Sequence, residues 1–433
     1  MSKHVIVISC DAMVYEDTEI LKKIPPLSYI WEKTARVDRV KSVYPTITYP
    51  CHTTMQTGVY PDKHGILYND YFMPGERKIP WIHFRESIKA PTIFDTVKAA
   101  DPTLKTAAVF WPVTGNDSNI DYNVDEYWPQ TPEETTEDCF RNSGSTEEVI
   151  QKVVIPNKHF VEGRHRQHPF CDDFIFGCAC SMIREFKPNL LMIHPANIDS
   201  YRHGTGLFNA VVDSGVFETA HWLQLMVKAT QDAGIFEDTD WFIVSDHGQI
   251  DITQNVAVNA VLADKGWLKV DEEGNLVSWR AFVKSGGTSA LVYTADDFTE
   301  EEYNKLHKDL CELRDAGVYG IGDVFTKEEA AVHRIGGDFT FVLETNGHTS
   351  FSSDWCKPYM KPLGTGDYRY GKATHGHLPH KGPTPTLIAF GPDMKEGAVI
   401  ANANLVDEAP TFAHALGFEM ENVDGRVLTE LFK

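Results

Sequence analysis

A threonine stands at the start of a predicted helix in a segment whose residue types suit phosphoryl chemistry. The segment reads Tyr44-Pro-Thr-Ile-Thr-Tyr-Pro-Cys-His-Thr-Thr-Met-Gln-Thr-Gly58, and Thr48 lies where an apolar run gives way to a helical pattern. Backbone N–H groups point outward at a helix N-terminus, and the helix dipole favours negative charge there. Because a threonine hydroxyl is a poor nucleophile at neutral pH, it needs an activating group. We therefore expect Thr48 to attack phosphorus with help from elsewhere in the chain.

Four clusters of Asp and His along the chain are of the kind that hold two metal ions. They are Asp11 after the run 4–10, Asp199-Ser-Tyr-Arg-His203 after the run 190–194, Asp246-His247-Gly after the run 241–245, and His375-Gly. In the first three, an apolar run of strand length ends in a metal-ligand residue type. Because the carboxyl ends of parallel strands lie along one edge of a sheet, we expect these side chains to converge in a crevice there.

Each cluster also has an ordinary structural interpretation when it is taken alone. The first aspartate could cap a helix, the Asp-x-x-x-His pair could be a surface pair on a helix, and the last histidine could lie in a loop. Two adjacent ligand types after a strand, as at Asp246 and His247, are a poor choice for packing. The presence of all four clusters in one chain with Thr48 favours the chemical interpretation.

With these features the chain resembles the alkaline phosphatase superfamily, and within it the type I phosphodiesterase/nucleotide pyrophosphatase family. The matching pieces run in the family's order from near the N-terminus to the C-terminal region. They are Asp11, Pro45-Thr-Ile-Thr48-Tyr-Pro-x-His52, Gly58-Val-Tyr-Pro-Asp-Lys-His64-Gly-Ile-Leu-Tyr-Asn69, Phe110-Trp-Pro112, Asp199-x-x-x-His203, Asp246-His247-Gly and His375-Gly. The Thr48 segment with Asn69 downstream is the specific part of the match.

The resemblance implies two zinc ions, each with three protein ligands and an open position. The ligands implied for one ion are Asp199, His203 and His375, and those for the other are Asp11, Asp246 and His247, with the oxygen of Thr48 as its reactive ligand. Two such ions about 4 Å apart can clamp the attacking and leaving oxygens of an in-line displacement. Because Asp/His sets accept several divalent ions, Mn²⁺ or another ion could replace zinc.

The resemblance also implies a covalent phospho-Thr48 intermediate that water then hydrolyses. The side-chain amide of Asn69 and the backbone N–H of Tyr49 would donate to a non-bridging phosphoryl oxygen. Loss of one such donor typically lowers the rate roughly a hundred- to a thousandfold. Without the resemblance, Asn69 would be interpreted as a turn residue.

Two residues beside the motifs have no role implied by the pattern. Cys51 stands where nucleotide-hydrolysing relatives often carry Asn, and Arg202 could face either the anion or the solvent. Sulfatase relatives use an oxidised Cys in a Cys-x-Pro-Ser-Arg motif. Since Cys51-His-Thr-Thr lacks the Pro and the Arg, the sulfatase interpretation is disfavoured.

The composition is that of a globular protein with an acidic surface. The chain has 433 residues, 42% of them hydrophobic, and a formal charge of −22. Its length is sufficient for a large core. Binding of a nucleic-acid polymer depends on Lys and Arg that neutralise phosphates, so we expect no such partner. A small-molecule phosphoester drawn to a bimetal site is compatible with this charge.

The prediction for location is a cytoplasmic protein without a membrane partner. The first apolar run follows Met-Ser-Lys at once, with no leader pattern, and no window approaches the length of a membrane span. The eight cysteines show no framework spacing, which favours reduced thiols.

The alternation of apolar runs predicts an α/β fold, with a central, mostly parallel sheet sandwiched by helices and a smaller α+β cap or insert. We expect the alkaline phosphatase-like core over 1–262 and 375–433, with a lid or insert over 113–170, and a smaller α+β subdomain over 263–374. The helical patterns cover 91–100, 172–186, 208–233 and 300–316.

Aromatic and basic residues near the motifs are candidates for substrate contacts. Tyr49 follows the nucleophile, and in nucleotide-hydrolysing relatives an aromatic residue there helps to hold a base. Residues that could form the opposite wall, or else pack in the core or lid, are Trp111, Tyr122, Tyr127 and Trp128. Residues that could instead hold a second phosphate or a carboxylate are Arg164, Arg166, Lys357 and Lys361.

The sequence favours a two-zinc hydrolase of phosphodiester or phosphoanhydride bonds. A monoester is a dianion and usually needs an additional cation, but no Arg or Lys adjoins Thr48 in sequence. The alternatives are a phosphomonoesterase, or a C–P bond hydrolase of the phosphonoacetate hydrolase type, with the same site. A non-catalytic metal-binding protein is disfavoured, because the nucleophile and all six proposed ligands are present.

Overall fold

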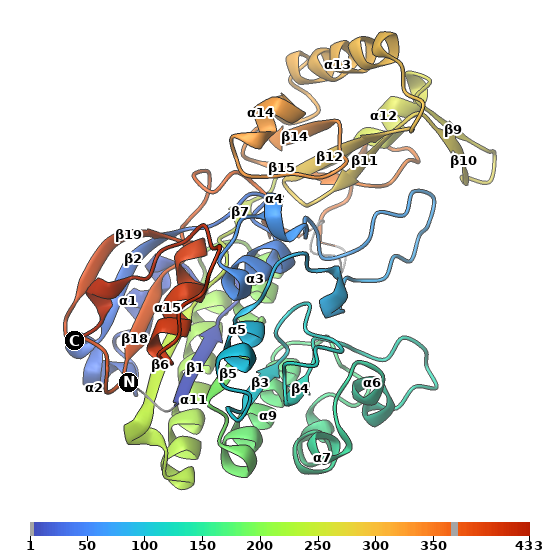
Figure 1. The fold of residues 1–433 in the computed structure, drawn as a ribbon. Coiled ribbons are helices and arrows are strands. Elements are labelled where there is room, and N and C mark those ends of the chain that lie inside the picture. The colour runs from blue at the N-terminus through green and yellow to red at the C-terminus, as the bar shows by residue number, and fades with distance from the viewer. Residues whose placement is uncertain (1–3, 365–370) are drawn as a thin grey trace.

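A computed structural model describes residues 4–364 and 371–433 and contains a central eight-stranded sheet (Figure 1). The strand order is β19-β2-β18-β6-β1-β5-β3-β4. The bounds are β1 His4–Ser9, β2 Ala35–Lys41, β3 Thr106–Val109, β4 Tyr122–Val124, β5 Leu190–Ile193, β6 Thr239–Val244, β18 Leu387–Phe390 and β19 Val399–Asn404. Of these eight strands, only β18 runs antiparallel to its neighbours. The predicted mostly parallel sheet is confirmed.

Strand β1 illustrates why an uninterrupted apolar run becomes a central strand. Its side chains alternate between the two faces of the sheet, so Val5 and Val7 join one apolar cluster while Ile6 and Ile8 join the other. All four are at most 1% exposed. Because both faces are covered, the run contains no polar position until the strand ends, as is typical of parallel sheets.

Helices cover both faces of the sheet. The cluster of Ile6 and Ile8 includes α1 (Thr18–Leu21), α9 (Phe170–Phe186) and α11 (Ala210–Ala233), and the cluster of Val5 and Val7 includes α3 (Thr48–Thr57), α5 (Ile93–Ala100) and α15 (Glu408–Ala415). On the first face, the rings of Phe176 and Trp222 stack with centroids 5.0 Å apart. The predicted arrangement of a sheet between helices is therefore confirmed.

The four helices predicted from the sequence all form, with ends shifted by no more than two residues. They are α5, α9, α11 and α13 (Glu300–Asp315). Helices α5 and α11 each begin two residues later than predicted, directly after a capping residue. Thr92 Oγ1 accepts the N–H of Asp95 (3.2 Å), and Asn209 Oδ1 accepts the N–H of Val211 (3.0 Å). Each cap satisfies a backbone donor that the first helical turn leaves unpaired.

A smaller antiparallel sheet lies at the top of Figure 1, beside α13 and α14 (Lys327–Ala331). Its order is β11-β12-β14-β13, with bounds Ala281–Ser285, Ser289–Thr294, Phe341–Thr345 and Ile321–Thr326 in that order. Tyr44 and Ile47, just before α3, pack against Leu291 and Val342 of this sheet. The smaller sheet thus supports the segment that leads to Thr48.

The chain enters the smaller unit before the predicted boundary at residue 262. Strand β8 (Gln254–Ala257) pairs with β15 (Thr349–Ser352) and β16 (Met360–Lys361). Helix α12 (Val258–Asp264) follows it, and its apolar residues join the cluster of the smaller sheet. The division of the chain into two parts stays a prediction. These contacts group residues 254–262 with the segment 263–374, because the apolar side chains of 254–262 are buried against the smaller sheet.

The segment 113–170, predicted as a lid or insert, contributes to the main sheet as well as covering it. Its first strand, β4, is the edge strand beside β3. The short helices that follow are α6 Thr136–Asn142, α7 Glu147–Val149, η4 Ile150–Val154, α8 Ile155–Asn157 and η5 Lys158–Phe160. Asn123 of β4 donates to the carbonyl of Thr114 (2.7 Å), which fixes the start of the segment.

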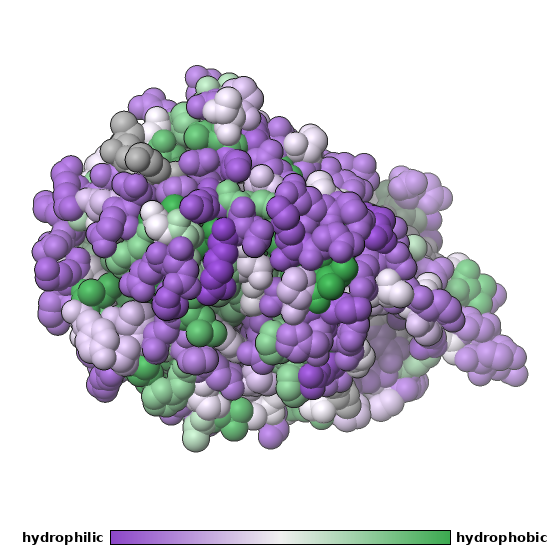
Figure 2. All heavy atoms as spheres, turned by 90° about the horizontal axis from the view of Figure 1, so that it is seen from below, coloured by the Kyte–Doolittle hydropathy of each residue, from purple (hydrophilic) through white to green (hydrophobic). Residues whose placement is uncertain are grey.

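The surface is polar, with isolated apolar side chains. Figure 2 shows one face of the molecule that is mostly hydrophilic, with scattered hydrophobic residues. Exposed large apolar residues include Tyr29 and Phe208. Within the described residues, every helix is too short or too polar to cross a bilayer. None of the eight cysteines forms a disulfide.

A buried carboxyl group, that of Asp240, lies near the start of β6. Asp246 and His247 follow the opposite end of this strand. Asp240 is fully buried, and its Oδ1 accepts the N–H of Asp393 (3.2 Å). Burial raises the pKa of Asp240 from 3.8 to about 7. The folded protein therefore holds this proton up to about pH 7, whereas the unfolded chain releases it near pH 4, so stability falls as the pH rises between these values.

We predict that Asp240→Asn stabilises the protein more at alkaline than at acidic pH, because the amide keeps the acceptor oxygen and never ionises. The gain in the free energy of unfolding should be about 2–3 kcal/mol larger at pH 8 than at pH 5. Urea denaturation at both pH values measures it. Glu396→Gln, at a side chain 63% exposed, is the control and should show no such difference. A gain in the free energy of unfolding that does not depend on pH would contradict a raised pKa of Asp240.

Candidate active site

Acidic and histidine side chains meet at the carboxyl edge of three neighbouring parallel strands. Asp11 follows β1, Asp246 and His247 follow β6, and Asp199 lies in α10 (Asn197–Thr205) after β5. His375 follows β17 (Ala373–Thr374), which pairs with β7 (Ile250–Asp251). The convergence predicted from the strand endings is therefore present in the structure.

One group of possible metal ligands consists of Asp11, Asp246 and His247, whose ligand atoms lie within 4.8 Å of one another. His247 Nε2 lies 3.1 Å from Asp246 Oδ2, 3.5 Å from Asp11 Oδ1 and 3.3 Å from Thr48 Oγ1. Among the described residues, Asp11 Oδ1 and Asp246 Oδ2 are buried without a hydrogen-bond donor. Buried carboxylate oxygens require a donor or a cation, so this set fits a divalent ion.

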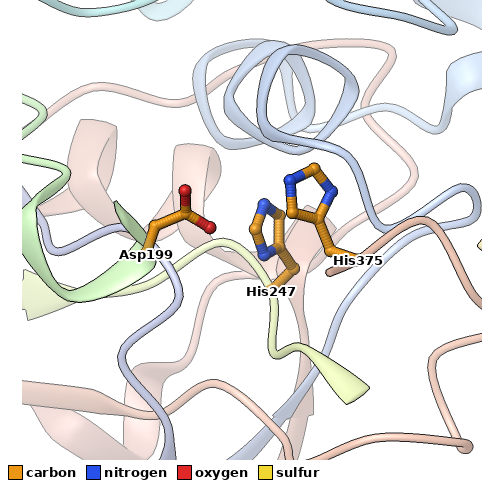
Figure 3. Close-up of side chains that lie close together, drawn as sticks. All are labelled: Asp199, His247 and His375. Atoms are coloured by element: carbon orange, nitrogen blue, oxygen red, sulfur yellow. The ribbon is translucent and has the colours of Figure 1, made fainter. Parts of the chain in front are cut away.

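A second group consists of Asp199, His247 and His375, which point toward one another in Figure 3. The imidazole rings of His247 and His375 stack with centroids 4.2 Å apart. His203, the ligand expected beside Asp199, lies close by, with its Nε2 3.1 Å from Asp199 Oδ2. The structure thus brings all six predicted ligands together, and it places His247 between the two groups.

Hydrogen bonds from neighbouring residues fix the orientation of these ligands. His203 Nδ1 donates to the carbonyl of Ala373 (2.7 Å), which turns Nε2 toward Asp199. Gln249 Nε2 donates to Asp199 Oδ1 (2.5 Å), and His194 Nε2 donates to Asp11 Oδ2 (3.1 Å). Such outer contacts orient ligands and adjust their basicity. No sequence pattern indicated Gln249 or His194, although His194 ends the apolar run 190–194.

The protonation of these groups depends on their burial. Burial, assisted by the charge of Asp199, raises the pKa of Asp11 to about 7, and burial holds the pKa of Asp246 well above its usual range. Burial also lowers the pKa of His375 to about 3 and that of His247 well below its usual value. Neutral imidazoles are the form that binds metal, and a bound cation would favour the ionised carboxylates.

The position of Thr48 is fixed from two sides. It is the first residue of α3, preceded by Ile47 in extended conformation, and it is 6% exposed. Two residues earlier, Thr46 Oγ1 accepts the N–H of Gly376 (3.0 Å) and donates to the carbonyl of His377 (2.9 Å). These bonds attach the Thr48 segment to the loop that carries His375.

Asn69 contacts α3, the helix that Thr48 begins, in a way that differs from expectation. Its Oδ1 accepts the backbone N–H of Tyr49 (2.9 Å). The Tyr49 N–H, expected to bind a phosphoryl oxygen, is therefore engaged within the protein. The bond leaves the NH₂ end of the amide as the donor that Asn69 can offer at the cavity it lines.

A cavity of about 500 Å³ opens beside these residues. Thr48, Asn69 and Asp199 line one part of it, and Trp128 and Arg166 from the segment 113–170 line another. A volume of this size suits a small organic ligand.

The three aromatic residues predicted to bind substrate do not line this cavity. Tyr49 and Trp111 are fully buried: Tyr49 packs edge-on against Trp81 (5.3 Å between centroids), and Trp111 lies in the apolar cluster between the sheet and α3. Tyr127 packs on the ring of His83 (4.8 Å). The aromatic rings that line the cavity are instead Trp128, considered from the sequence, Phe110 of the Phe110-Trp-Pro112 segment, and Trp81, which no sequence pattern indicated.

Most basic residues considered as substrate contacts are engaged elsewhere. The guanidinium of Arg164 stacks over Phe170 (3.8 Å to the centroid), while the amines of Lys357 and Lys361 pair with Asp264 and Asp354. Arg166 is the one member of that set among the residues lining the cavity, within the described part of the chain.

The structure also answers the two questions left by the motifs. Arg202 is buried and forms two hydrogen bonds with the carboxylate of Asp17 (2.8 and 2.9 Å), so it faces neither the anion site nor the solvent. Cys51 is buried with its Sγ 3.3 Å from Ser42 Oγ, and burial raises the pKa of its thiol well above the usual value. The contacts of both residues are therefore with buried groups of the protein itself.

Comparison with known proteins agrees with this site. Residues 5–376 match the family described as type I phosphodiesterase / nucleotide pyrophosphatase. The chain belongs to this family. The resemblance inferred from the motifs is thereby confirmed.

Relatives of this phosphodiesterase family member are distant in sequence. An ectonucleotide pyrophosphatase/phosphodiesterase of Caenorhabditis elegans is 22% identical over 422 residues, covering 96% of this chain and 47% of the relative. Ectonucleotide pyrophosphatase/phosphodiesterase 1 of Saccharomyces cerevisiae is 26% identical over 247 residues, covering 51% of this chain and 30% of the relative. The chain thus spans less than half the length of these relatives.

Solved structures share the fold. Murine ectonucleotide pyrophosphatase/phosphodiesterase 5 matches with a TM-score of 0.68 and 19% identity, covering 99% of this chain and 100% of that chain. An inactive threonine-to-alanine variant of the murine protein in complex with AMP matches equally well, covering 100% of both chains. The mostly parallel sheet flanked by helices is therefore the fold of these proteins.

We predict that Asp246→Ala removes about one divalent ion per chain, because it deletes a buried carboxylate oxygen that has no hydrogen-bond donor among the described residues. Metal analysis after dialysis measures the content. Asp240→Asn is the matched control, since Asp240 is also fully buried and lies in β6, the strand that Asp246 follows, but is outside both ligand groups. Equal metal content in the wild type and in Asp246→Ala would contradict the site.

Proposed function

We propose that the chain is a metal-dependent phosphodiesterase/nucleotide pyrophosphatase with Thr48 as its nucleophile. The observation that carries this proposal is the place of Thr48 Oγ1, 3.3 Å from His247 Nε2 at the cavity and beside the unsatisfied oxygens of Asp11 and Asp246. Membership of the family supports it. So does the murine relative, which bound AMP as an inactive threonine-to-alanine variant.

The two ligand groups fit zinc, which takes His nitrogen and carboxylate oxygen ligands, although Mn²⁺ has similar preferences. Ions bound there would lower the pKa of the Thr48 hydroxyl and stabilise the negative charge on the attacking and leaving oxygens. The residues that would hold them are Asp11, Asp246, His247 and Thr48 for one ion, and Asp199, His203 and His375 for the other.

The chemistry of the protein's own groups then proceeds in two displacements. In the first, Thr48 Oγ1 forms a bond to phosphorus as the bond from phosphorus to the leaving oxygen breaks, and the hydroxyl proton is released. In the second, a water oxygen forms a bond to phosphorus as the bond from phosphorus to Thr48 Oγ1 breaks. A proton from the water restores the Thr48 hydroxyl. The NH₂ group of Asn69 donates to a non-bridging oxygen in both steps, and the N-terminus of α3 favours its negative charge.

A second candidate is a phosphomonoesterase or a C–P bond hydrolase that uses the same site. The observation in its favour is Arg166 at the cavity, because a monoester dianion benefits from a further cation. A non-catalytic metal-binding protein is the remaining alternative. Relative rates on diesters and monoesters separate these candidates.

We predict that zinc-loaded protein hydrolyses bis-p-nitrophenyl phosphate faster than p-nitrophenyl phosphate, and that Thr48→Ala lowers both rates about a thousandfold or more. Release of p-nitrophenol measures the rates. Thr48→Ser keeps the hydroxyl and should retain much of the activity, and EDTA should abolish it. A faster monoester rate would favour the phosphatase, and full activity in Thr48→Ala would exclude Thr48 as the nucleophile.

We predict that Asn69→Asp lowers kcat roughly a hundred- to a thousandfold, because aspartate keeps the oxygen that accepts the Tyr49 N–H but loses the NH₂ donor. Steady-state kinetics measure this, with metal analysis to show that the ions remain bound. Asn69→Ala should be at least as slow. If Asn69→Asp were fully active, the residue would act only by holding Tyr49.

A further inference from the structure

Arg166 is the only Lys or Arg among the described residues that line the cavity. Its guanidinium lies over two indole rings, 4.7 Å from the centroid of Trp81 and 4.4 Å from that of Trp128. The two rings meet edge to face, 5.2 Å apart and at 84°. Cation–π contacts with two perpendicular rings restrict where the guanidinium can lie.

Many arginines and lysines of this acidic chain pair with carboxylates, whereas Arg166 pairs with none among the described residues. Arg280, for example, binds Asp297 and Glu302, and Lys361 binds Asp354. Within residues 4–364 and 371–433, Arg166 forms no ion pair with a carboxylate, and its recorded contacts are the two indole faces. A guanidinium has five N–H donors, so those that do not point at an indole ring are available to an anion.

A chain of aromatic contacts connects Arg166 to the nucleophile. Tyr49, the neighbour of Thr48 in α3, is buried and packs edge-on against Trp81, with centroids 5.3 Å apart. Trp81 in turn contacts Arg166. The distance from the N–H edge of Arg166 to Thr48 is therefore set by packed rings rather than by a flexible side chain alone.

The support behind Trp128 is uncharged. The ring of His83 packs against Trp128 (4.9 Å between centroids), and its Nδ1 donates to the carbonyl of Glu126 (2.7 Å). Burial lowers the pKa of His83 to about 4, so this imidazole is neutral at physiological pH. Arg166 is thus the fixed positive charge of this wall.

We propose that Arg166 binds a second phosphate of the substrate, adjacent to the phosphorus that Thr48 attacks, and so selects pyrophosphate-containing nucleotides over simple diesters. The planar guanidinium can offer two parallel N–H donors to phosphate oxygens. The cavity of about 500 Å³ has room for two phosphates and part of a nucleoside. This inference rests on the proposed function, because it takes the cavity at Thr48 as the substrate site.

Binding of ADP and AMP to zinc-loaded Thr48→Ala protein tests the proposal, since this background prevents turnover. Isothermal titration should show that adding Arg166→Gln raises the Kd for ADP about tenfold or more and that for AMP less than about threefold. Arg164→Gln is the matched control, because Arg164 lies two residues away, stacks over Phe170 and does not line the cavity. It should change neither Kd by more than about twofold.

If Arg166→Gln raised the Kd for ADP and the Kd for AMP equally, the proposal would be overturned. Arg166 would then contact a part of the ligand that ADP and AMP share, as expected for a phosphomonoesterase. No weakening of ADP would overturn it as well. Hydrolysis of bis-p-nitrophenyl phosphate by the wild type tests the proposed function separately. If the wild type hydrolyses the diester but Arg166→Gln leaves the Kd for ADP unchanged, only the contact between Arg166 and a second phosphate is rejected. If Arg166→Gln weakens ADP binding but the wild type does not hydrolyse the diester, only the proposed hydrolase activity is rejected.

Discussion

The burial of several carboxylates and imidazoles within a few ångströms of one another is the constraint on which the rest of the structure depends. Asp11, Asp246 and His247 are nearly inaccessible to water, and one oxygen of each aspartate, Asp11 Oδ1 and Asp246 Oδ2, has no donor among the described residues. Such a cluster is unfavourable in an apolar interior unless a cation occupies it. A parallel sheet makes the arrangement possible, because neighbouring strand ends deliver ligands from distant parts of the chain to one edge.

The smaller sheet helps to hold Thr48, the proposed nucleophile, beside this cluster. Tyr44 donates to Glu344 Oε2 (2.9 Å), and Ile47 packs in the same apolar cluster as Val342. Burial raises the pKa of Glu344 to about 7. The smaller sheet therefore anchors the extended segment before α3, and α3 then starts at the residue that faces the ligands.

Local patterns in the sequence were sufficient to predict the main sheet, the long helices and the convergence of the candidate ligand residues, because a strand or helix and the residue that ends it are neighbours in the chain. The run 4–10 ending in Asp11 is an example. Patterns failed where a role depends on distant packing. Trp81 stands in an irregular loop and gains its place from Tyr49 and Trp128, and only the fold distinguishes Arg166 from the three other basic candidates. The sharing of His247 by both ligand groups likewise depends on three-dimensional geometry.

The two walls of the cavity come from separate parts of the chain, and this has an evolutionary consequence. The sheet edge supplies the proposed reacting groups, whereas Trp128 and Arg166 belong to the segment 113–170, which follows the main sheet's β3 and consists largely of short helices. Substitutions or length changes in that segment can alter which molecules fit while the ligands of the sheet edge stay in place. The fold thereby separates the proposed reaction centre from the segment that would set its selectivity.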